Sequence, residues 1–251
     1  MTRLDHAVIF VDDVAEAMHQ YAANGFTVST GGTHAGGLTH NALISFADGT
    51  YVELLGFTWS SAFQDLHKAL TTGVMAARLE GSTALDRRFL PRGSTGPGLA
   101  DFAVSCDNLD AVITAARGEG LVIDGPFPGS RHKPDGTEVS WNLAMPRDNI
   151  LPFLIEDLTD RRRRVQPVDV SHHANGVTGI VEVRYRVNET GLESFTKLAN
   201  ALGVSVRSDT HSAILDLPVG QVSLSVGVVA EERPYEVSFA LTEGGRLSHP
   251  Q

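Results

Sequence analysis

One order of elements, a strand followed by a helix and three further strands, recurs three times along this chain. The first copy begins with the apolar strand "HAVIFV" and continues into a helix whose apolar residues fall on one face before Gly25. The second copy starts 95 residues later at "DFAVSC", and the third, which contains the strand "GIVEVRYRV", aligns with the first at an offset of 178 residues. In each copy twelve residues separate the position of Asp13 from the glycine that ends the helix. This agreement predicts three βαβββ units.

The repeat predicts how the chain is divided. We expect the first unit over residues 1–57, a helical insertion and linker over 58–97, the second unit over 98–158, a linker over 159–176, the third unit over 177–242 and a mobile tail over 243–251. Within the insertion, "SAFQDLHKALTTGVMAARLE" indicates a helix and "LPRGSTGPG" a loop. The second linker carries four consecutive arginines, residues 161–164, which we interpret as solvated, with an anion contact as the alternative.

Composition narrows the classes of function. The formal net charge of −10 disfavours nucleic acid as a partner. No apolar run approaches the roughly 18 residues that span a bilayer, and the N-terminal stretch lacks the features of a signal peptide. Cys106 is the only cysteine, which excludes a thiolate-rich metal site and fits a reducing compartment. We therefore expect a cytoplasmic protein without nucleic-acid or membrane partners that binds a small molecule, and a homodimer is compatible with the sequence.

Several motifs resemble a known superfamily. They are "LDHAV" and "GTYVELLGF" at the two ends of the first unit, "RHKPDGTEVSWNLAMP" in the second and "HHANGVTGI" before the third. These stretches are similar to the glyoxalase-like domain proteins of the vicinal oxygen chelate superfamily. The resemblance implies an α+β fold, in which tandem βαβββ units form curved, mainly antiparallel mixed sheets with helices on the outer face. It also implies a small-molecule site inside the curved sheet, with metal ligands at His6 and Glu53 in members that use a metal.

Strand alternation tests this pair on physical grounds. His6 and Val8 share one face of the first strand, and Tyr51 and Glu53 share one face of the fourth. A carboxylate buried in an apolar strand is costly unless it is paired, hydrogen-bonded or metal-bound. A solvent-facing Glu53 on an edge strand is the alternative.

The second unit supplies an incomplete counterpart. At the offset of 95, Asp101 takes the position of His6, while Phe153, which cannot ligate a metal, takes that of Glu53. One hypothesis is a divalent ion (Zn, Fe, Mn, Ni or Co) held by His6, Glu53 and Asp101. The other is that no metal binds, and that His6 and Glu53 contact an organic ligand directly.

Five further residues are candidates for substrate binding: His34, Asn41, Arg131, Trp141 and His173. The first two lie in the glycine-rich "GGTHAGGLTHN", which allows close approach of the backbone to a ligand. Arg131, in a predicted turn, suits a carboxylate or phosphate group. Trp141 fits a pocket wall or ordinary core. His172 and His173 are adjacent, and neighbouring residues of an extended segment point to opposite faces, so at most one of them can point into the site; His173 is our candidate.

Together with these residues, the resemblance implies a glyoxalase-like enzyme acting on a small, oxygen-rich organic molecule. Glu53 and His6 are the candidate catalytic residues, with Glu53 as a general base or as a ligand of a Lewis-acidic metal. Isomerase, lyase and dioxygenase outcomes are all compatible with this scaffold. The alternative is a non-catalytic protein that binds or sequesters a small molecule, as resistance proteins do.

Overall fold

The computed structural model describes residues 2–34, 39–58, 84–93, 96–133, 136–227 and 234–250. Its elements are β1 (Arg3–Phe10), α1 (Val14–Ala23), β2 (Ser29–Thr33), β3 (Thr39–Ser45), β4 (Tyr51–Phe57), α4 (Ala84–Gly93), β5 (Gly98–Ser105), α5 (Leu109–Gly118), β6 (Ile123–His132), β7 (Glu138–Pro146), β8 (Phe153–Asp157), α6 (Arg161–Arg164), β9 (Val177–Val187), α7 (Glu189–Leu202), β10 (Ser205–Ser208), β11 (Ser212–Asp216), β12 (Gln221–Val226), β13 (Pro234–Leu241) and β14 (Arg246–Pro250). The repeated order occurs as β1-α1-β2-β3-β4, β5-α5-β6-β7-β8 and β9-α7-β10-β11-β12. The domain boundaries given above stay a prediction.

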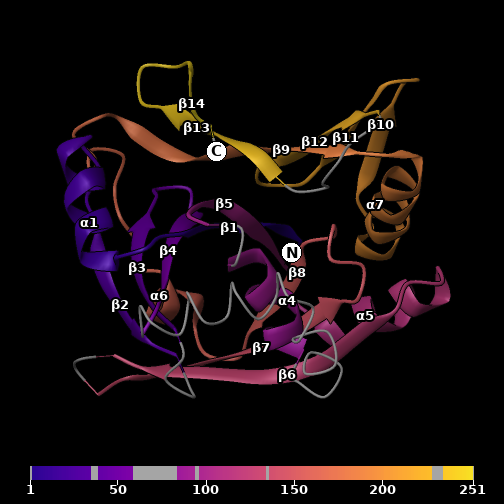
Figure 1. Cartoon of the computed structure of the whole chain (residues 1–251), viewed down its shortest axis with the longest axis horizontal. Coiled ribbons are helices and arrows are strands. Elements are labelled where there is room, and N and C mark those ends of the chain that lie inside the picture. The colour runs from indigo at the N-terminus through magenta and orange to yellow at the C-terminus, as the bar shows by residue number, and fades with distance from the viewer. Residues whose placement is uncertain are drawn as a thin grey trace.

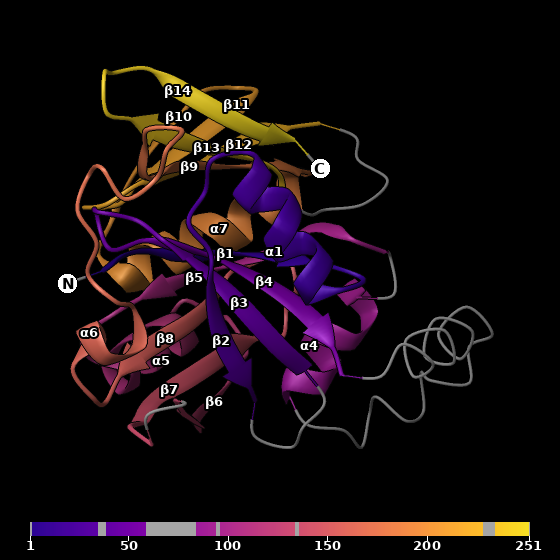
Figure 2. The ribbon, with the colours of Figure 1, turned by 90° about the vertical axis from the view of Figure 1, so that its left-hand side faces the viewer.

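The first two of these runs form one eight-stranded sheet, sheet A, in the order β2-β3-β4-β1-β5-β8-β7-β6. The central strands β1 and β5 are antiparallel, whereas β1 pairs in parallel with β4, and β5 with β8. Sheet A curls, and its two edge strands β2 and β6 contact each other (Figure 2). This mixed, curled α+β architecture confirms the predicted fold class.

The third run, together with the two strands β13 and β14 that follow it, forms a separate six-stranded sheet, sheet B, in the order β10-β11-β12-β9-β13-β14. Sheet B lies across sheet A at the top of Figure 1, with α1 and α7 toward the two sides. Its last strand corrects the prediction of a mobile tail over 243–251. Residues 246–250 pair with β13, with Leu247 opposite Phe239, because the apolar strand β13 has an open edge that this segment fills.

The three helices begin at equivalent side chains. Asp13, Asn108 and Asn188 each precede a helix, and each side chain accepts a hydrogen bond from the backbone N–H three residues further along. Such a cap is worth about 1 kcal/mol to the helix. The caps therefore explain in part where each helix starts; the third helix begins earlier in its repeat than the other two, because Asn188 caps it and Gly191 takes the position of Asp13.

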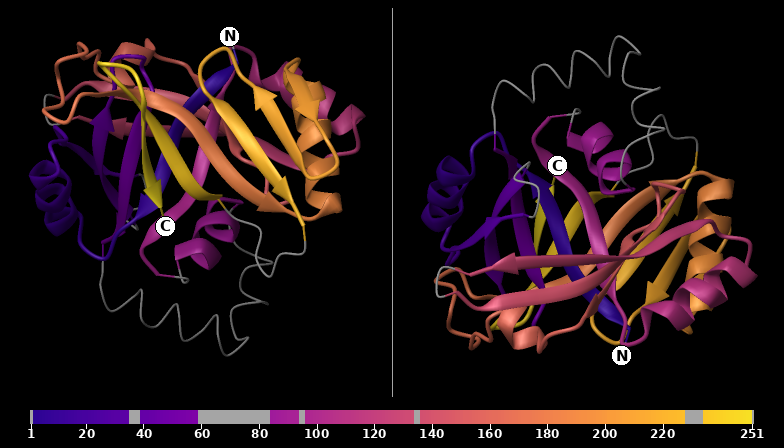
Figure 3. Two further views of the ribbon diagram at one scale, coloured as in Figure 1. Left: turned by 90° about the horizontal axis from the view of Figure 1, so that it is seen from above. Right: turned by 90° about the horizontal axis from the view of Figure 1, so that it is seen from below.

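The residues of β1 alternate between two apolar clusters. Ala7 and Ile9 face a large core that sheet A shares with α1, α5, α7 and sheet B. In this core the Phe102 ring of sheet A lies 5.9 Å from the Tyr185 ring of sheet B. Val8 and Phe10 point to the opposite side of sheet A. We call that side the inner face, because the sheet curls around it (Figure 3, right).

The inner face carries its own apolar residues, which we call the inner cluster: Val8, Phe10, Leu55, Ala84, Ala103, Val139, Trp141, Leu143, Met145, Phe153 and Ile155. Ala84 belongs to α4, so this helix packs against the inner face. The helix also corrects the predicted loop "LPRGSTGPG", since residues 90–93 form its last turn. A proline within a helix removes a backbone hydrogen bond, which costs least near the end of the helix. The predicted helix over residues 61–80 lies outside the described residues.

The described helices were compared with what a membrane-spanning helix requires. None of these helices is both long enough and apolar enough to cross a bilayer.

Candidate functional site

Four polar side chains meet on the inner face, and we call them the carboxylate cluster: His6, His34, Asn41 and Glu53. In the β1–β4 register Tyr51 pairs with His6 and Glu53 with Val8, so His6 and Glu53 are diagonal neighbours on one face. The Nε2 atom of His6 lies 3.6 Å from Glu53 Oε2. The Nε2 atom of His34 lies 3.5 Å from the other oxygen, Oε1, which also accepts a hydrogen bond from Asn41 Nδ2.

Glu53 is therefore not a solvent-facing residue of an edge strand. β4 lies between β1 and β3, and the residue is only 9% exposed. A carboxylate buried this far needs partners, and Asn41 and the two imidazoles supply them. The cluster combines a carboxylate with two imidazoles, a set of groups able to accept, hold and return a proton.

Asp5 fixes the tautomer of His6. Its Oδ1 atom lies 2.6 Å from His6 Nδ1. Burial alone would raise the pKa of Asp5, but Arg164, the hydrogen bond with His6 and Arg161 together hold that pKa well below its usual range. Because the ionised carboxylate can only accept, the proton lies on Nδ1 and the neutral ring has its Nε2 lone pair toward Glu53. Nε2 of His6 then faces Glu53 Oε2 across 3.6 Å.

Arg164 holds two residues that contact His6, namely Asp5 and Tyr51. Its guanidinium donates to both oxygens of Asp5 at 3.0 Å and to the Tyr51 hydroxyl at 2.8 Å. The Tyr51 ring stacks on His6 with centroids 4.3 Å apart. Arg164 is only 4% exposed, and Arg161 also contacts Asp5. The arginine run is therefore not simply solvated: α6 directs two of its four arginines toward the protein.

A glycine allows Asn41 to reach Glu53. A Cβ atom on Gly31 of β2 would lie 1.9 Å from Asn41 Oδ1, far inside van der Waals contact. His34 closes the same side of the cluster, with its Nδ1 atom 2.9 Å from Thr39 Oγ1 and its Nε2 atom 3.4 Å from Asn41 Nδ2. The glycine-rich motif thus brings two predicted residues into the cluster.

Arg131 and Trp141 also lie on the inner face. Arg131 is in β6 rather than in the predicted turn, because the strand continues to His132 and pairs Arg131 with Val139 of the inner cluster. Its Nη2 atom donates to the Arg164 carbonyl at 2.8 Å. Its buried Nε atom has no hydrogen-bond partner among the described residues. Trp141 belongs to the inner cluster, and its indole lies directly over Gly129.

His173, the remaining predicted substrate-binding residue, lies away from the carboxylate cluster. Its Nδ1 atom accepts from the Thr27 backbone N–H at 2.9 Å, and its Nε2 atom donates to the Ser45 carbonyl at 2.9 Å. Burial lowers the pKa of His173, in keeping with this neutral tautomer. Both ring nitrogens are used to join the second linker to the first unit.

The predicted three-ligand metal site is not assembled. Asp101 pairs with Arg88, at 2.7 Å from Nε and 2.8 Å from Nη2, and with Arg92 at 2.6 Å. The centroid of the Phe153 ring lies 5.3 Å from that of the His6 ring and 5.5 Å from Arg88 Cζ. Each imidazole of the carboxylate cluster faces a different oxygen of Glu53, and among the described residues no three His, Cys, Asp or Glu side chains are grouped to hold a metal ion. The side chains therefore do not fit the predicted metal.

Sequence reasoning missed several residues that support the cluster. Asp5 stands next to His6 in "LDHAV", and its adjacent charge is a usable signal for a histidine partner. Tyr51 shares its face with Glu53, which strand alternation also predicts. Arg164 and Arg88 give no comparable signal, because the buried carboxylates that they hold, Asp5 and Asp101, belong to other elements of the fold.

Comparison with known proteins bears on the fold and on the family. The model of a family described as glyoxalase-like domain matches residues 4–203. A search of curated proteins gives no match. A hypothetical protein from Staphylococcus aureus has a crystal structure similar over 99% of this chain and 98% of its own, with 15% sequence identity and a TM-score of 0.68.

Two shorter proteins match part of the chain. Methylmalonyl-CoA epimerase from Streptomyces coelicolor covers 63% of this chain and 99% of its own, with 20% identity and a TM-score of 0.41. The same enzyme from Mycobacterium tuberculosis covers 62% of this chain and 89% of its own, with 20% identity and a TM-score of 0.39. The full-length similarity to the Staphylococcus aureus protein is one of fold.

Proposed function

This chain belongs to the glyoxalase-like domain family of the vicinal oxygen chelate superfamily, and on that premise we propose that its inner face binds a small, oxygen-rich organic anion on which Glu53 moves a proton. The observation that carries the proposal is the position of the Glu53 carboxylate, held between two imidazoles and an amide on the inner face. The resulting reaction class is proton transfer next to a carbonyl group, as in an isomerase or lyase.

Each member of the cluster has a role in this proposal. Asn41 holds Oε1 of Glu53, which leaves Oε2 to accept a proton from carbon. His6 takes part through Nε2, because Asp5 occupies its other nitrogen. His34 is the most exposed of the three ionisable members and is suited to meet the ligand from the solvent side. General acid–base groups placed in this way contribute on the order of 10²- to 10⁴-fold to a rate.

Arg131 supports an anionic ligand. A buried guanidinium with an unpartnered Nε–H has a donor for which the described protein supplies no acceptor. Carboxylates suit such a group because they accept two parallel hydrogen bonds from it. Trp141 and the other aromatic residues of the inner cluster offer an apolar surface for the rest of the molecule.

No step of this proposal passes through a metal ion. Asp101 is neutralised by arginines, and His6 with Glu53 alone is a poor site for the Zn, Fe, Mn, Ni or Co ion considered from the sequence. We expect protein purified without chelator to hold less than one equivalent of divalent metal by elemental analysis. A stoichiometric ion that is lost in both His6→Ala and Glu53→Ala would overturn this part of the proposal.

Solvent exchange at carbon tests the proposed reaction. Incubation in D₂O with a panel of 2-oxo acids and 3-oxo acids should give deuterium incorporation, detected by NMR, at a rate above that without protein. Glu53→Gln should abolish the exchange. The matched control is Glu156→Gln, since Glu156 is a partly buried carboxylate of β8 that contacts Leu109 and Asn142 away from the cluster.

A non-catalytic binding protein is the second candidate, and the aromatic character of the inner cluster favours it. That function predicts saturable binding of a panel member with no exchange, and unchanged behaviour of Glu53→Gln. Location in the cytoplasm and a homodimer stay predictions from the sequence; light scattering of the purified chain tests the second.

A further inference from the structure

A group of hydrogen bonds around His173 joins the second linker to the first unit. We call this contact the clasp: residues 172–175 against residues 24–27 and Ser45. The His173 ring accepts from the Thr27 backbone N–H and donates to the Ser45 carbonyl, each at 2.9 Å. One imidazole thus uses both of its nitrogens to hold two separate backbone segments of the first unit.

The surroundings of the His173 ring are apolar and closed to water. The residue is 3% exposed. Its ring lies among those of Phe26 and Phe46, with centroids 5.7 and 5.1 Å away. A hydrogen bond lost here is costly, because a buried donor or acceptor cannot turn to solvent for a new partner.

The backbones approach each other closely on both sides of the ring. The Thr27 hydroxyl donates to the His172 carbonyl at 2.6 Å, and Asn175 Nδ2 donates to the Asn24 carbonyl at 2.9 Å. A Cβ atom on Gly25 would lie 2.9 Å from the Asn175 backbone nitrogen. The two segments therefore fit each other only in this close position.

Only the neutral ring fits the clasp. The Thr27 N–H is a donor at every pH, so Nδ1 of His173 must present a lone pair to it. Protonation places a hydrogen on Nδ1, and two donors then face each other across the distance of a hydrogen bond. We infer that the clasp is an acid-sensitive switch: protonation of His173 releases residues 172–175 of the second linker from the first unit.

Neighbouring charges do not offset the charge of a protonated ring. Burial lowers the pKa of His173, and the charge of His172, whose ring lies 4.9 Å away, lowers it further. Asp48 and Asp169, the acidic residues that lie near the clasp in the sequence, accept hydrogen bonds from residues two positions further on. Among the described residues no carboxylate pairs with His173.

The direction and size of the response follow from proton linkage. In the open form the imidazole has an ordinary pKa of about 6.5, and in the closed form its pKa is lower. Acid therefore protonates the open form first, so the clasp is most stable above about pH 6.5 and weakens as the pH falls below that value. From about pH 7.5 to about pH 5.5 the open population should rise on the order of tenfold.

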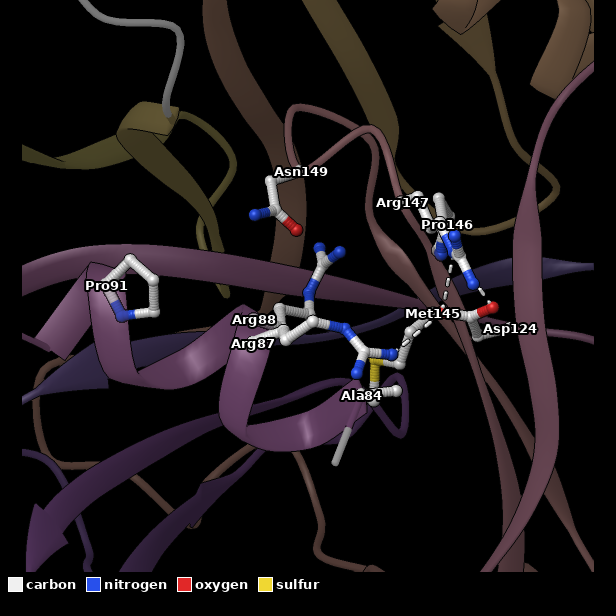
Figure 4. A pocket seen from close by; sticks show the side chains of 9 residues that line it. All are labelled: Ala84, Arg87, Arg88, Pro91, Asp124, Met145, Pro146, Arg147 and Asn149. Atoms are coloured by element: carbon white, nitrogen blue, oxygen red, sulfur yellow. Dashed lines mark hydrogen bonds and ion pairs between the residues drawn. The ribbon is translucent and has the colours of Figure 1, made fainter. Parts of the chain in front are cut away.

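Hydrogen exchange of backbone amides, followed by NMR on the full chain at these two pH values, tests the switch. The protection factor of the Thr27 amide should fall on the order of tenfold from the higher to the lower pH. The Arg147 amide, which donates to the Val122 carbonyl at 2.9 Å, is the internal reference. It lies beside the ion pairs of Asp124 with Arg147 and Arg87 (Figure 4). Its hydrogen bond with Arg147 lowers the pKa of Asp124, so the carboxylate stays ionised and the reference amide should keep its protection.

Two variants separate His173 from its neighbour. His173→Asn keeps an uncharged acceptor near the position of Nδ1 but does not titrate, so its Thr27 protection should be the same at both pH values. His172→Asn is the matched control and should respond like wild type. Glu53→Gln should also respond like wild type, because the switch does not depend on the proposed reaction.

The wild-type chain alone can overturn the inference, so the test does not depend on a variant that folds. Imidazole ¹⁵N spectra should show an unprotonated Nδ1 at the higher pH. A Thr27 amide with the same protection at both pH values would contradict the switch, as would an equal loss of protection at Arg147. A loss in His173→Asn as large as in wild type would exclude His173 as its cause.

Discussion

Asp5 is the residue that joins the candidate site to the stability of the fold. Its carboxylate accepts a hydrogen bond from the His6 ring and forms an ion pair with the buried Arg164. Replacement by asparagine leaves Asp157 as the only charged partner of Arg164 among the described residues. We expect Asp5→Asn to lower the free energy of unfolding by about 3 kcal/mol at neutral pH, the usual cost of breaking a buried ion pair. Urea denaturation measures this loss.

The pH dependence of that loss has a defined sign. The pKa of Asp5 is lower in the folded protein than in the unfolded chain, so acid protonates the unfolded chain first. The stabilising contribution is therefore complete above the unfolded carboxyl pKa of about 4 and is lost as the pH falls below it. The difference between wild type and Asp5→Asn should shrink over that range. A difference that stays constant down to about pH 3 would contradict this explanation.

Single residues differ in how far the sequence alone predicts them. His6 and Glu53 are predictable. Each lies in an apolar strand, and burying a polar side chain there is costly unless it has a partner. The surroundings of Asp101 are not predictable in this way, since the arginines that pair with it come from α4. No pattern near Asp101 indicates that this helix folds back onto it.

The hairpin of β2 and β3 is the element that shapes the carboxylate cluster. Its glycine at position 31 makes room for Asn41, and thereby for the contact with Glu53. Gly31→Ala should displace Asn41 and lower the exchange rate in D₂O on the order of tenfold, as the loss of one charge-assisted hydrogen bond does. Gly118→Ala in α5, where an added Cβ meets nothing within 4 Å, is the control. Equal rates in both variants would disprove the role given to the hairpin.

Elements with a strong local pattern are the predictable ones. The three capped helices and the central strands follow from apolar periodicity and from capping residues. The strand β14 does not, because its sequence "RLSHP" has little apolar character and becomes a strand only beside β13. Arg131 illustrates the same limit: β6 extends through "GSRH" because β7 pairs with it.

The shared core makes one cooperative unit of sheets A and B. Phe239 of sheet B contacts Phe26 and Phe46 of the first unit, with ring centroids 6.0 and 5.5 Å apart. Phe239→Ala should therefore destabilise the whole molecule by about 3 kcal/mol or more and lower a single thermal transition in calorimetry. Leu247→Ala, at a residue 42% exposed, is the control with little effect. Two separate transitions, with sheet B melting alone, would contradict a common core.

The arrangement of whole sheets is the level that the repeat does not determine. Three similar units could pair in several ways, and the βαβββ pattern of one unit does not indicate which other unit it pairs with. Here the first two units join through β1 and β5 into sheet A, while the third packs the helix side of its own sheet against them. The inner face of sheet A, which carries the carboxylate cluster, results from this pairing of β1 with β5.

The central claim is that this inner face moves a proton through Glu53 on an anion held by Arg131. The most direct measurement is the D₂O exchange rate, determined against substrate concentration for Glu53→Gln and Arg131→Gln. We expect Glu53→Gln to lower kcat on the order of 10²-fold or more with little change in KM. Arg131→Gln should chiefly raise KM. A Glu53→Gln protein that exchanges at the wild-type kcat would contradict the claim.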